Sequence, residues 1–195
     1  MAPQRKHDTE RILDVARTLV LRDGPRSTSV AAIARESEAP VGTLYHRFGN
    51  RDGLLAAAWL RALEGFQQHA LSAAESSDPL EAAVSMASSQ VSFARERPED
   101  ARLLLMVRRD DLLDADPDHK FRARLEEINA PLAKTLTRLT KALRGRTDAR
   151  AADDITRAIV DLPNATIRRY LRDDHKLPTW LEGDVGAAAR RLLTP

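Results

Sequence analysis

The chain of 195 residues contains no cysteine, which excludes disulfide bridges, thiolate nucleophiles and cysteine-based zinc sites. It also lacks long hydrophobic runs, because the longest, residues 54–60, is too short to span a bilayer. The opening segment MAPQRKHDTER has no apolar stretch of the kind that a signal peptide carries. We therefore expect a cytoplasmic protein that has no membrane partner.

Aromatic residues make up only 4% of the chain, whereas hydrophobic residues as a whole make up 43%. The hydrophobic residues are mostly Ala, Leu, Val and Ile, a composition that favours helices. No alternating apolar and polar run typical of a strand stands out, and ten prolines and eight glycines punctuate the chain. The sequence therefore predicts an all-α fold with a sizeable core, built as one large domain or two small ones.

Net charge is only +2, from 31 basic and 29 acidic residues. Residues 1–55 hold nine Lys/Arg and seven Asp/Glu, and the remainder holds 22 of each. The total charge is therefore a weak indicator of a nucleic-acid partner. Local charge is a better one, since the segment from Val41 to Arg51 has two arginines, one histidine and no acid.

Apolar side chains at helical spacing, with Gly, Pro and capping residues between them, predict the helices. Two short helices are expected between Ser29 and Gly49. The longer ones are expected over about residues 7–22, 51–74, 79–96, 99–113, 119–143, 149–172 and 179–193. Pro131 and Pro163 predict a kink or a shifted boundary within the helices that contain them.

The second short helix carries Thr43, Tyr45, His46 and Arg47 within one and a half turns, and it has no carboxylate. A helix this short and polar is a poor core element but is suited to an anionic groove. Because a helix-turn-helix places its second helix in the major groove of DNA, the pattern indicates a DNA-binding function.

Residues 11–59 resemble the TetR (tetracycline-repressor) family of bacterial transcriptional regulators. The most specific pieces are the Ile33-Ala34 pair and the segments VGTLYHRF, residues 41–48, and RDGLL, residues 51–55. The chain departs from the family pattern at Glu38, where glycine is common, and at Ala32, where an acid is common. A left-handed Glu38 would cost about 1–2 kcal/mol, so we expect the turn to be either reshaped or slightly strained, and Ala32 cannot complete a capping box.

The resemblance implies a three-helix helix-turn-helix DNA-binding domain over residues 7–66. It is joined through a long fourth helix to a helical effector-binding and dimerisation domain over residues 67–195. Dimerisation would use the last two helices, at about 149–172 and 179–193, although their apolar residues could equally form a monomeric core. A homodimer is favoured because paired DNA half-sites require two reading heads.

The resemblance also implies the DNA-contacting residues, which are Ser29, Val41, Gly42, Thr43, Tyr45, His46, Arg47 and Arg51. Tyr45 would bind a phosphate, Val41 and Thr43 would reach bases, and Gly42 would let the backbone approach DNA. The two arginines would bind phosphate or guanine. Each residue also has an alternative without DNA. The tyrosine would be half-buried in the core, the histidine and the arginines would be solvated without a partner, Val41 and Thr43 would be ordinary helix surface, and Ser29 would only cap its helix.

An effector pocket would lie among the helices expected over about residues 51–172. Its candidate lining residues are Trp59, Phe66, Met86, Gln90, Phe93, Met106, Phe121, Asn129 and Asn164. The alternative is that the aromatic and Met side chains are plain core and the amides are solvated or internally satisfied. The histidines lack ligand-like spacing, so we expect no metal, and we expect no catalytic residues and no cofactor beyond a small-molecule effector.

These observations predict a sequence-specific transcriptional regulator in the bacterial cytosol, associated with the nucleoid when it binds DNA. The resemblance implies a homodimeric repressor that a small molecule releases from a palindromic operator, by favouring a conformation in which the fourth helix swings. The alternatives are an activator, a regulator without a ligand, a protein-interaction bundle with a degenerate reading head, or a helical enzyme. No nucleophile–base pair or phosphate loop favours the enzyme.

Overall fold

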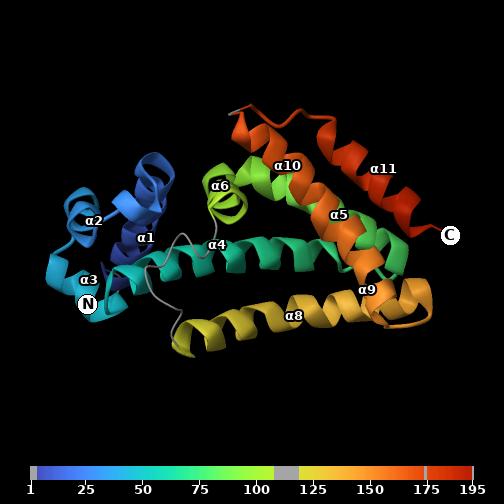
Figure 1. The fold of residues 1–195 in the computed structure, drawn as a ribbon, viewed down its shortest axis with the longest axis horizontal. Coiled ribbons are helices and arrows are strands. Elements are labelled where there is room, and N and C mark those ends of the chain that lie inside the picture. The colour runs from blue at the N-terminus through green and yellow to red at the C-terminus, as the bar shows by residue number, and fades with distance from the viewer. Residues whose placement is uncertain (1–3, 108–118, 174, 195) are drawn as a thin grey trace. The chain divides into compact units, whose positions relative to one another are not determined.

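The computed structural model describes residues 4–107, 119–173 and 175–194, with side chains from Thr9 onward. These residues form helices and no strand (Figure 1), so the all-α prediction is confirmed. The chain divides into two compact units, unit 1 from Met1–Leu63 with Glu99–Leu125 and unit 2 from Glu64–Pro98 with Glu126–Pro195. None of the described helices is both long enough and apolar enough to cross a membrane.

The helices of the N-terminal part follow the expected order. Their bounds are α1 Gln4–Asp23, the 3-10 turn η1 Pro25–Ser27, α2 Val30–Ser37, α3 Val41–Phe48, α4 Arg51–Ala73, α5 Pro79–Glu96 and α6 Pro98–Met106. The expected span of 79–96 for α5 is matched at both ends, because Asp78 caps it and Arg97-Pro98 ends it. α6 ends at Met106, and the expected helix over 108–113 and loop over 114–118 lie outside the described residues.

The C-terminal helices are α8 His119–Arg144, α9 Ala149–Thr156, α10 Leu162–Arg172 and α11 Leu181–Leu193. α8 continues through Pro131 without a break. The expected single helix over 149–172 is instead divided by a π-helical turn, η2 Arg157–Asp161. Pro163 follows this turn and lacks the N–H that would complete a regular α-helical ladder to Ile159, which explains a local change of helix type at this place.

The core of unit 1 joins α1, α2 and α3 to the first half of α4 and to α6. The expected stripe on α1 is buried at Ile12, Ala16, Leu19 and Val20, with Val15 packed at its edge. The other buried members are Leu13, Val30, Ile33, Ala34, Leu44, Leu54, Leu55, Ala58, Ala62 and Leu103. Because α3 contributes Leu44 to this core, the orientation of α3 is fixed by burial rather than by its own short length.

The core of unit 2 is a cluster at the end of α4 and along α5, α8, α9, η2 and α11. Its buried members are Ala70, Ala74, Ala82, Ala83, Met86, Leu139, Ile155, Ala158, Ile159 and Leu193. At its surface, Arg190 of α11 donates a hydrogen bond of 2.6 Å to Glu81 of α5, which lowers the pKa of Glu81. Arg95 similarly donates to Glu182 at 2.8 Å, so two ion pairs attach α11 to α5.

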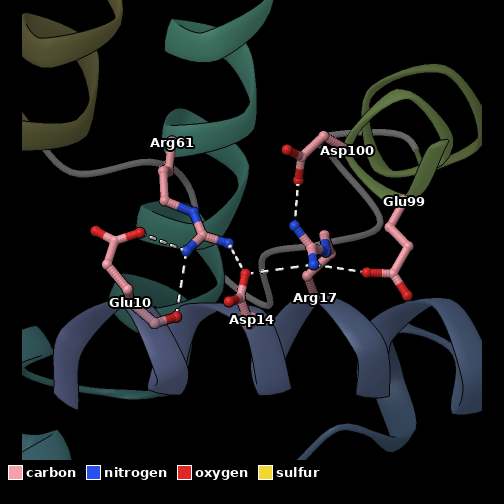
Figure 2. A network of polar contacts seen from close by, with 6 residues as sticks. All are labelled: Glu10, Asp14, Arg17, Arg61, Glu99 and Asp100. Carbon is pink, nitrogen blue, oxygen red and sulfur yellow. Dashed lines mark hydrogen bonds and ion pairs between the residues drawn. The ribbon is translucent and has the colours of Figure 1, made fainter. Parts of the chain in front are cut away.

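A network of ion pairs attaches α6 and α4 to α1 within unit 1 (Figure 2). Arg17 of α1 donates to Asp100 and to Glu99 of α6, each at 2.6 Å, and contacts Asp14 at 3.3 Å. Arg61 of α4 donates to Asp14 at 2.7 Å and to Glu10 at 2.9 Å. Asp14 is therefore shared by the two guanidinium groups.

The Arg17–Asp100 pair is the most protected part of this network, with side chains 15% and 9% exposed. Burial opposes the charge on Arg17, but the hydrogen bond and the charge of Asp100 outweigh it, so the pKa of Arg17 is raised. Removing one partner of such a pair leaves the other charge buried and uncompensated.

The first prediction concerns this pair. We expect Arg17→Ala to lower the free energy of unfolding by about 3 kcal/mol, because it leaves Asp100 unpaired. Arg11→Ala is the matched control on the same helix, since Arg11 pairs with Glu38 at 2.6 Å in an exposed setting and should cost less than about 1 kcal/mol. Denaturant unfolding of the two variants measures both values, and equal losses would contradict a special role for the protected pair.

Candidate nucleic-acid interface

The N-terminus of α2 is capped by Ser29, whose side chain accepts a hydrogen bond from the Ala32 N–H at 3.1 Å. Beside it, the buried Thr28 donates from Oγ1 to the Gly24 carbonyl at 2.9 Å. Ala32 has no side chain that could return a bond to the cap, so the cap is one-sided, as the sequence predicted. Ser29 nevertheless remains exposed, and its hydroxyl lies at the positive end of the helix.

The turn between α2 and α3 contains the left-handed residue that the sequence made suspect. Glu38 has φ 57° and ψ 26°, and it is the one non-glycine residue with positive φ in the described chain. Its N–H still caps the end of α2 through the Ala34 and Arg35 carbonyls. The turn therefore keeps the left-handed geometry that glycine would adopt without strain, and it does so at a conformational cost.

α3 turns one face to the core and the opposite face to solvent. Leu44 is buried and Phe48 is half-buried against the core, whereas Tyr45 is 51% exposed and Val41 is 44% exposed. Gly42 and His46 are exposed as well, and Thr43 is half-buried beside them. The exposed positions alternate with the buried ones at helical spacing, so they form a single face of α3, which we call the reading face.

Two glycines near this face differ in what their surroundings require. A side chain at Gly53 would collide with the Phe48 carbonyl, since its Cβ would lie 2.1 Å from that oxygen. Glycine at 53 therefore allows the start of α4 to approach the end of α3. The side chain of Asn50 caps α4 by accepting a hydrogen bond from the Gly53 N–H at 2.8 Å. At Gly42 a Cβ would meet nothing within 4 Å, so no neighbour within the described chain requires glycine there.

The two arginines predicted to contact DNA are both engaged within unit 1. Arg47 donates to the Thr9 hydroxyl at 2.8 Å. Arg51 is 19% exposed, donates from Nε to the Thr28 carbonyl at 2.9 Å and from Nη2 to the Pro25 carbonyl, and pairs with Asp52. The guanidinium of Arg51 thus ties the start of α4 to the segment that precedes α2, a contact between main chain and side chain that sequence spacing does not reveal. Their contacts with DNA stay predictions.

The residues predicted to line an effector pocket fall into two groups. Trp59, Met106 and Phe121 belong to unit 1, where the rings of Trp59 and Phe121 lie 6.3 Å apart. Phe66, Met86, Gln90, Phe93, Asn129 and Asn164 belong to unit 2, where the rings of Phe66 and Phe93 meet edge-to-face at 5.3 Å. Met86 lies in the apolar cluster of unit 2 and Met106 is exposed, so the two methionines have different surroundings.

Gln67 of α4 was missed by the sequence analysis. It is buried, and its Nε2 donates to Asn129 Oδ1 at 2.6 Å. The signal that could have revealed it is its spacing, since of the adjacent pair Gln67 and Gln68 only Gln67 lies three residues before the buried Ala70 on α4. Among the residues that the structure describes, no group of three or more acidic, histidine or cysteine side chains is placed to hold a metal ion.

The strained turn leads to the second prediction. Glu38→Gly should raise the free energy of unfolding by about 1 kcal/mol, because it relieves the left-handed strain, and Glu38→Ala should not. The alanine variant controls for loss of the exposed ion pair with Arg11. Ala31→Gly, at an exposed position inside α2, should cost about 1 kcal/mol. Thermal or denaturant unfolding measures the free energy of unfolding of each variant. A lower value for Glu38→Gly than for the wild type would contradict the inference that Glu38 is strained.

The contacts of Arg51 lead to the third prediction. Arg51→Lys keeps the charge but cannot bridge two carbonyls with a planar fork, so it should lower the free energy of unfolding by about 1–2 kcal/mol. Arg35→Lys is the control, because Arg35 is 75% exposed on α2 and its ion pair with Glu36 is 3.7 Å long. If Arg51→Lys and Arg35→Lys unfold at the same midpoint, the hydrogen bonds from Arg51 to the main chain contribute nothing to stability.

The comparisons with known proteins agree on the family of the N-terminal region. Residues 12–58 match the family model of bacterial regulatory proteins of the tetR family. None of the curated proteins matches the sequence.

Solved structures extend the likeness to the fold of the whole chain. A TetR family transcription regulator from Marinobacter aquaeolei has a TM-score of 0.76 at 16% identity, covering 98% of each chain. The fatty acid degradation regulator FadR from Bacillus halodurans has a TM-score of 0.72 at 16% identity, covering 99% of this chain and 96% of that one. FadR from Bacillus subtilis, solved with stearoyl-CoA, has a TM-score of 0.73 at 16% identity, covering 94% and 97%. Residues 12–58 thus match the TetR family model, and the chain as a whole shares the fold of solved TetR family transcription regulators.

Proposed function

We propose that this regulator is a homodimeric repressor that binds a palindromic operator and is released from it by a small-molecule effector. The observation that carries the proposal is the reading face of α3. It presents Val41, Gly42, Tyr45 and His46 to solvent while Leu44 anchors the helix in the core. An exposed aromatic residue beside a glycine with no internal role is what close approach to a duplex would use.

The reading face supplies one half of a recognition site. A second copy related by a two-fold axis would present an equivalent α3 to the next major groove, one helical turn away. In unit 2, Ile155, Ile159 and Leu193 are buried within the protomer, whereas Leu162 of α10 and Leu192 of α11 are 44% and 47% exposed. We assign the dimer contact to α10 and α11 because their exposed leucines are not used by the protomer's own core.

The effector response is proposed from the separation of the chain into two units and from its structural relatives. FadR from Bacillus subtilis was solved with stearoyl-CoA, so a fold of this kind accommodates a small molecule. α4 contributes Leu54 and Leu55 to the core of unit 1 and Ala70 and Ala74 to that of unit 2. A ligand that prefers one conformation of unit 2 could therefore bias the DNA-binding unit through α4, and operator would weaken ligand binding reciprocally.

The proposal places the protein in the bacterial cytosol, with no catalytic role and no cofactor other than the effector. An activator or a regulator without a ligand would share the same reading face. Transcription from a reporter with the selected operator, measured with and without this chain, separates repression from activation.

The first experiment is a selection of random duplexes by the purified protein, followed by titration of the enriched site. A palindromic consensus would support a dimeric sequence reader. Salt-sensitive binding without any consensus would contradict sequence-specific regulation, because phosphate contacts alone give that behaviour.

The fourth prediction concerns the Tyr45 hydroxyl. Tyr45→Phe should weaken operator binding about tenfold, because it removes a hydrogen bond to a charged phosphate. The slope of log affinity against log salt should stay unchanged, since the lost donor is neutral. Thr137→Val is the control, because the exposed Thr137 hydroxyl donates to the Ala133 carbonyl within α8 and belongs to neither the reading face nor the helices assigned to the dimer contact. Fluorescence anisotropy at several salt concentrations measures both variants, and unchanged affinity for Tyr45→Phe would refute the phosphate contact.

A further inference from the structure

Arg51 uses all three nitrogens of its guanidinium group within unit 1. Its Nε donates to the Thr28 carbonyl at 2.9 Å, and its Nη2 donates to the Pro25 carbonyl. Its Nη1 donates to Asp52 at 2.9 Å, so its charge is already paired, and its side chain is only 19% exposed. A phosphate of DNA would therefore have to compete with Asp52 for this charge.

The two carbonyls that Arg51 binds lie at the two ends of the turn η1. The Pro25 carbonyl belongs to the peptide group that leads into Arg26. The Thr28 carbonyl belongs to the peptide group that leads into Ser29. Because a peptide group is planar, holding its oxygen also orients the backbone of the residue that follows it. Arg51 therefore orients the backbone at two exposed polar residues, Arg26 and Ser29.

The turn also has hydrogen bonds of its own. The Thr28 N–H donates to the Pro25 carbonyl at 3.2 Å, and the Thr28 hydroxyl donates to the Gly24 carbonyl at 2.9 Å. These bonds hold the shape of the turn, whereas the bonds from Arg51 attach the turn to the first residue of α4. If Arg51 left the turn to bind DNA, the carbonyl of the buried Thr28 would lose this donor, which is unfavourable.

Arg26 differs from the other arginines near it. Among the arginines of residues 9–63, it is the one that makes no hydrogen bond or ion pair with a described residue. The others are engaged, as Arg11 is with Glu38 and Arg47 is with Thr9. An exposed guanidinium without an internal partner can bind a phosphate oxygen without breaking another contact.

We propose that Arg51 is a positioning residue for DNA binding and that Arg26 is the arginine that binds a phosphate. Arg51 acts through the main chain of η1, whose orientation determines where the Arg26 side chain is presented. The family resemblance implies a direct DNA contact for Arg51, and its hydrogen bonds assign it this different role. The proposal rests on the proposed function, because it concerns the same DNA-binding unit.

The fifth prediction uses the salt dependence of operator binding, because each lost phosphate contact lowers the slope of log affinity against log salt by about 0.9. Arg26→Gln should lower the slope by that amount and weaken binding to all duplex sequences alike. Arg51→Lys keeps the charge but cannot bond both carbonyls, so it should lower the slope equally. The double variant should lower it no further. Lys134→Gln is the control, since it removes an exposed charge from α8 and should leave the slope unchanged.

Three results in fluorescence anisotropy would overturn the proposal. A wild-type slope in Arg51→Lys would show that the bonds of Arg51 to the turn do not act on DNA binding. A slope lowered by about 1.8 in the double variant would show that the two arginines act independently. A slope for Arg26→Gln equal to that for Lys134→Gln would show that Arg26 binds no phosphate.

Loss of folded protein cannot imitate the expected result. It lowers the fraction of protein that binds, which circular dichroism of the same samples measures, but it leaves the slope of the folded fraction unchanged. Arg26→Gln replaces an exposed side chain without a partner, so it decides even if Arg51→Lys fails to fold. A wild-type protein that selects no consensus would refute the proposed function. A clear consensus together with any of the three contrary results would refute this inference alone.

Discussion

The reading face depends on the burial of Leu44. A helix of eight residues is too short to be stable alone in water, so α3 exists because its inner side is held by the core of unit 1. Leu44, at 1% exposure, faces inward while Tyr45, the next residue, faces outward at 51%. The inward contact therefore determines which side chains are presented. A change in the packing of α1 or α4 beneath Leu44 would rotate the reading face without altering any residue on it.

In the same region, tertiary contacts impose backbone conformations that the local sequence alone would not favour. Glu38 adopts a left-handed conformation that an acidic residue disfavours, and Gly53 is required because the Phe48 carbonyl occupies the place of a Cβ. Arg51 then satisfies two main-chain carbonyls on either side of the loop before α2. Each feature fixes an end of α2, α3 or α4, so these main-chain constraints act together with the burial of Leu44 in holding the short helices in place.

Much of the fold could be predicted because its signals are local. The stripe on α1 and the boundaries of α5 follow from spacing and capping residues, whereas the missing glycine at Glu38 predicted only that the turn would be reshaped or strained. The rest depends on contacts between distant residues. Arg17 and Asp100 are 83 positions apart, and Arg51 bonds to carbonyls that carry no sequence signal. Gln90 of α5 donates to the Ile159 carbonyl within the π-helical turn, a contact 69 positions apart, whereas Pro163 alone predicted only a disturbed helix.

The two units use polar groups differently, and this difference bears on regulation. Unit 1 is held by ion pairs around Arg17 and Arg61 and would bind an anionic polymer, so salt weakens both its surface pairs and its contacts with phosphate. The buried polar groups of unit 2 in the described chain are neutral, and hydrogen bonds among neutral groups respond little to salt. Under the proposed function, the affinity for the effector should therefore change less with salt concentration than the affinity for DNA. The response to the effector would then be separated from the ionic conditions that weaken DNA binding.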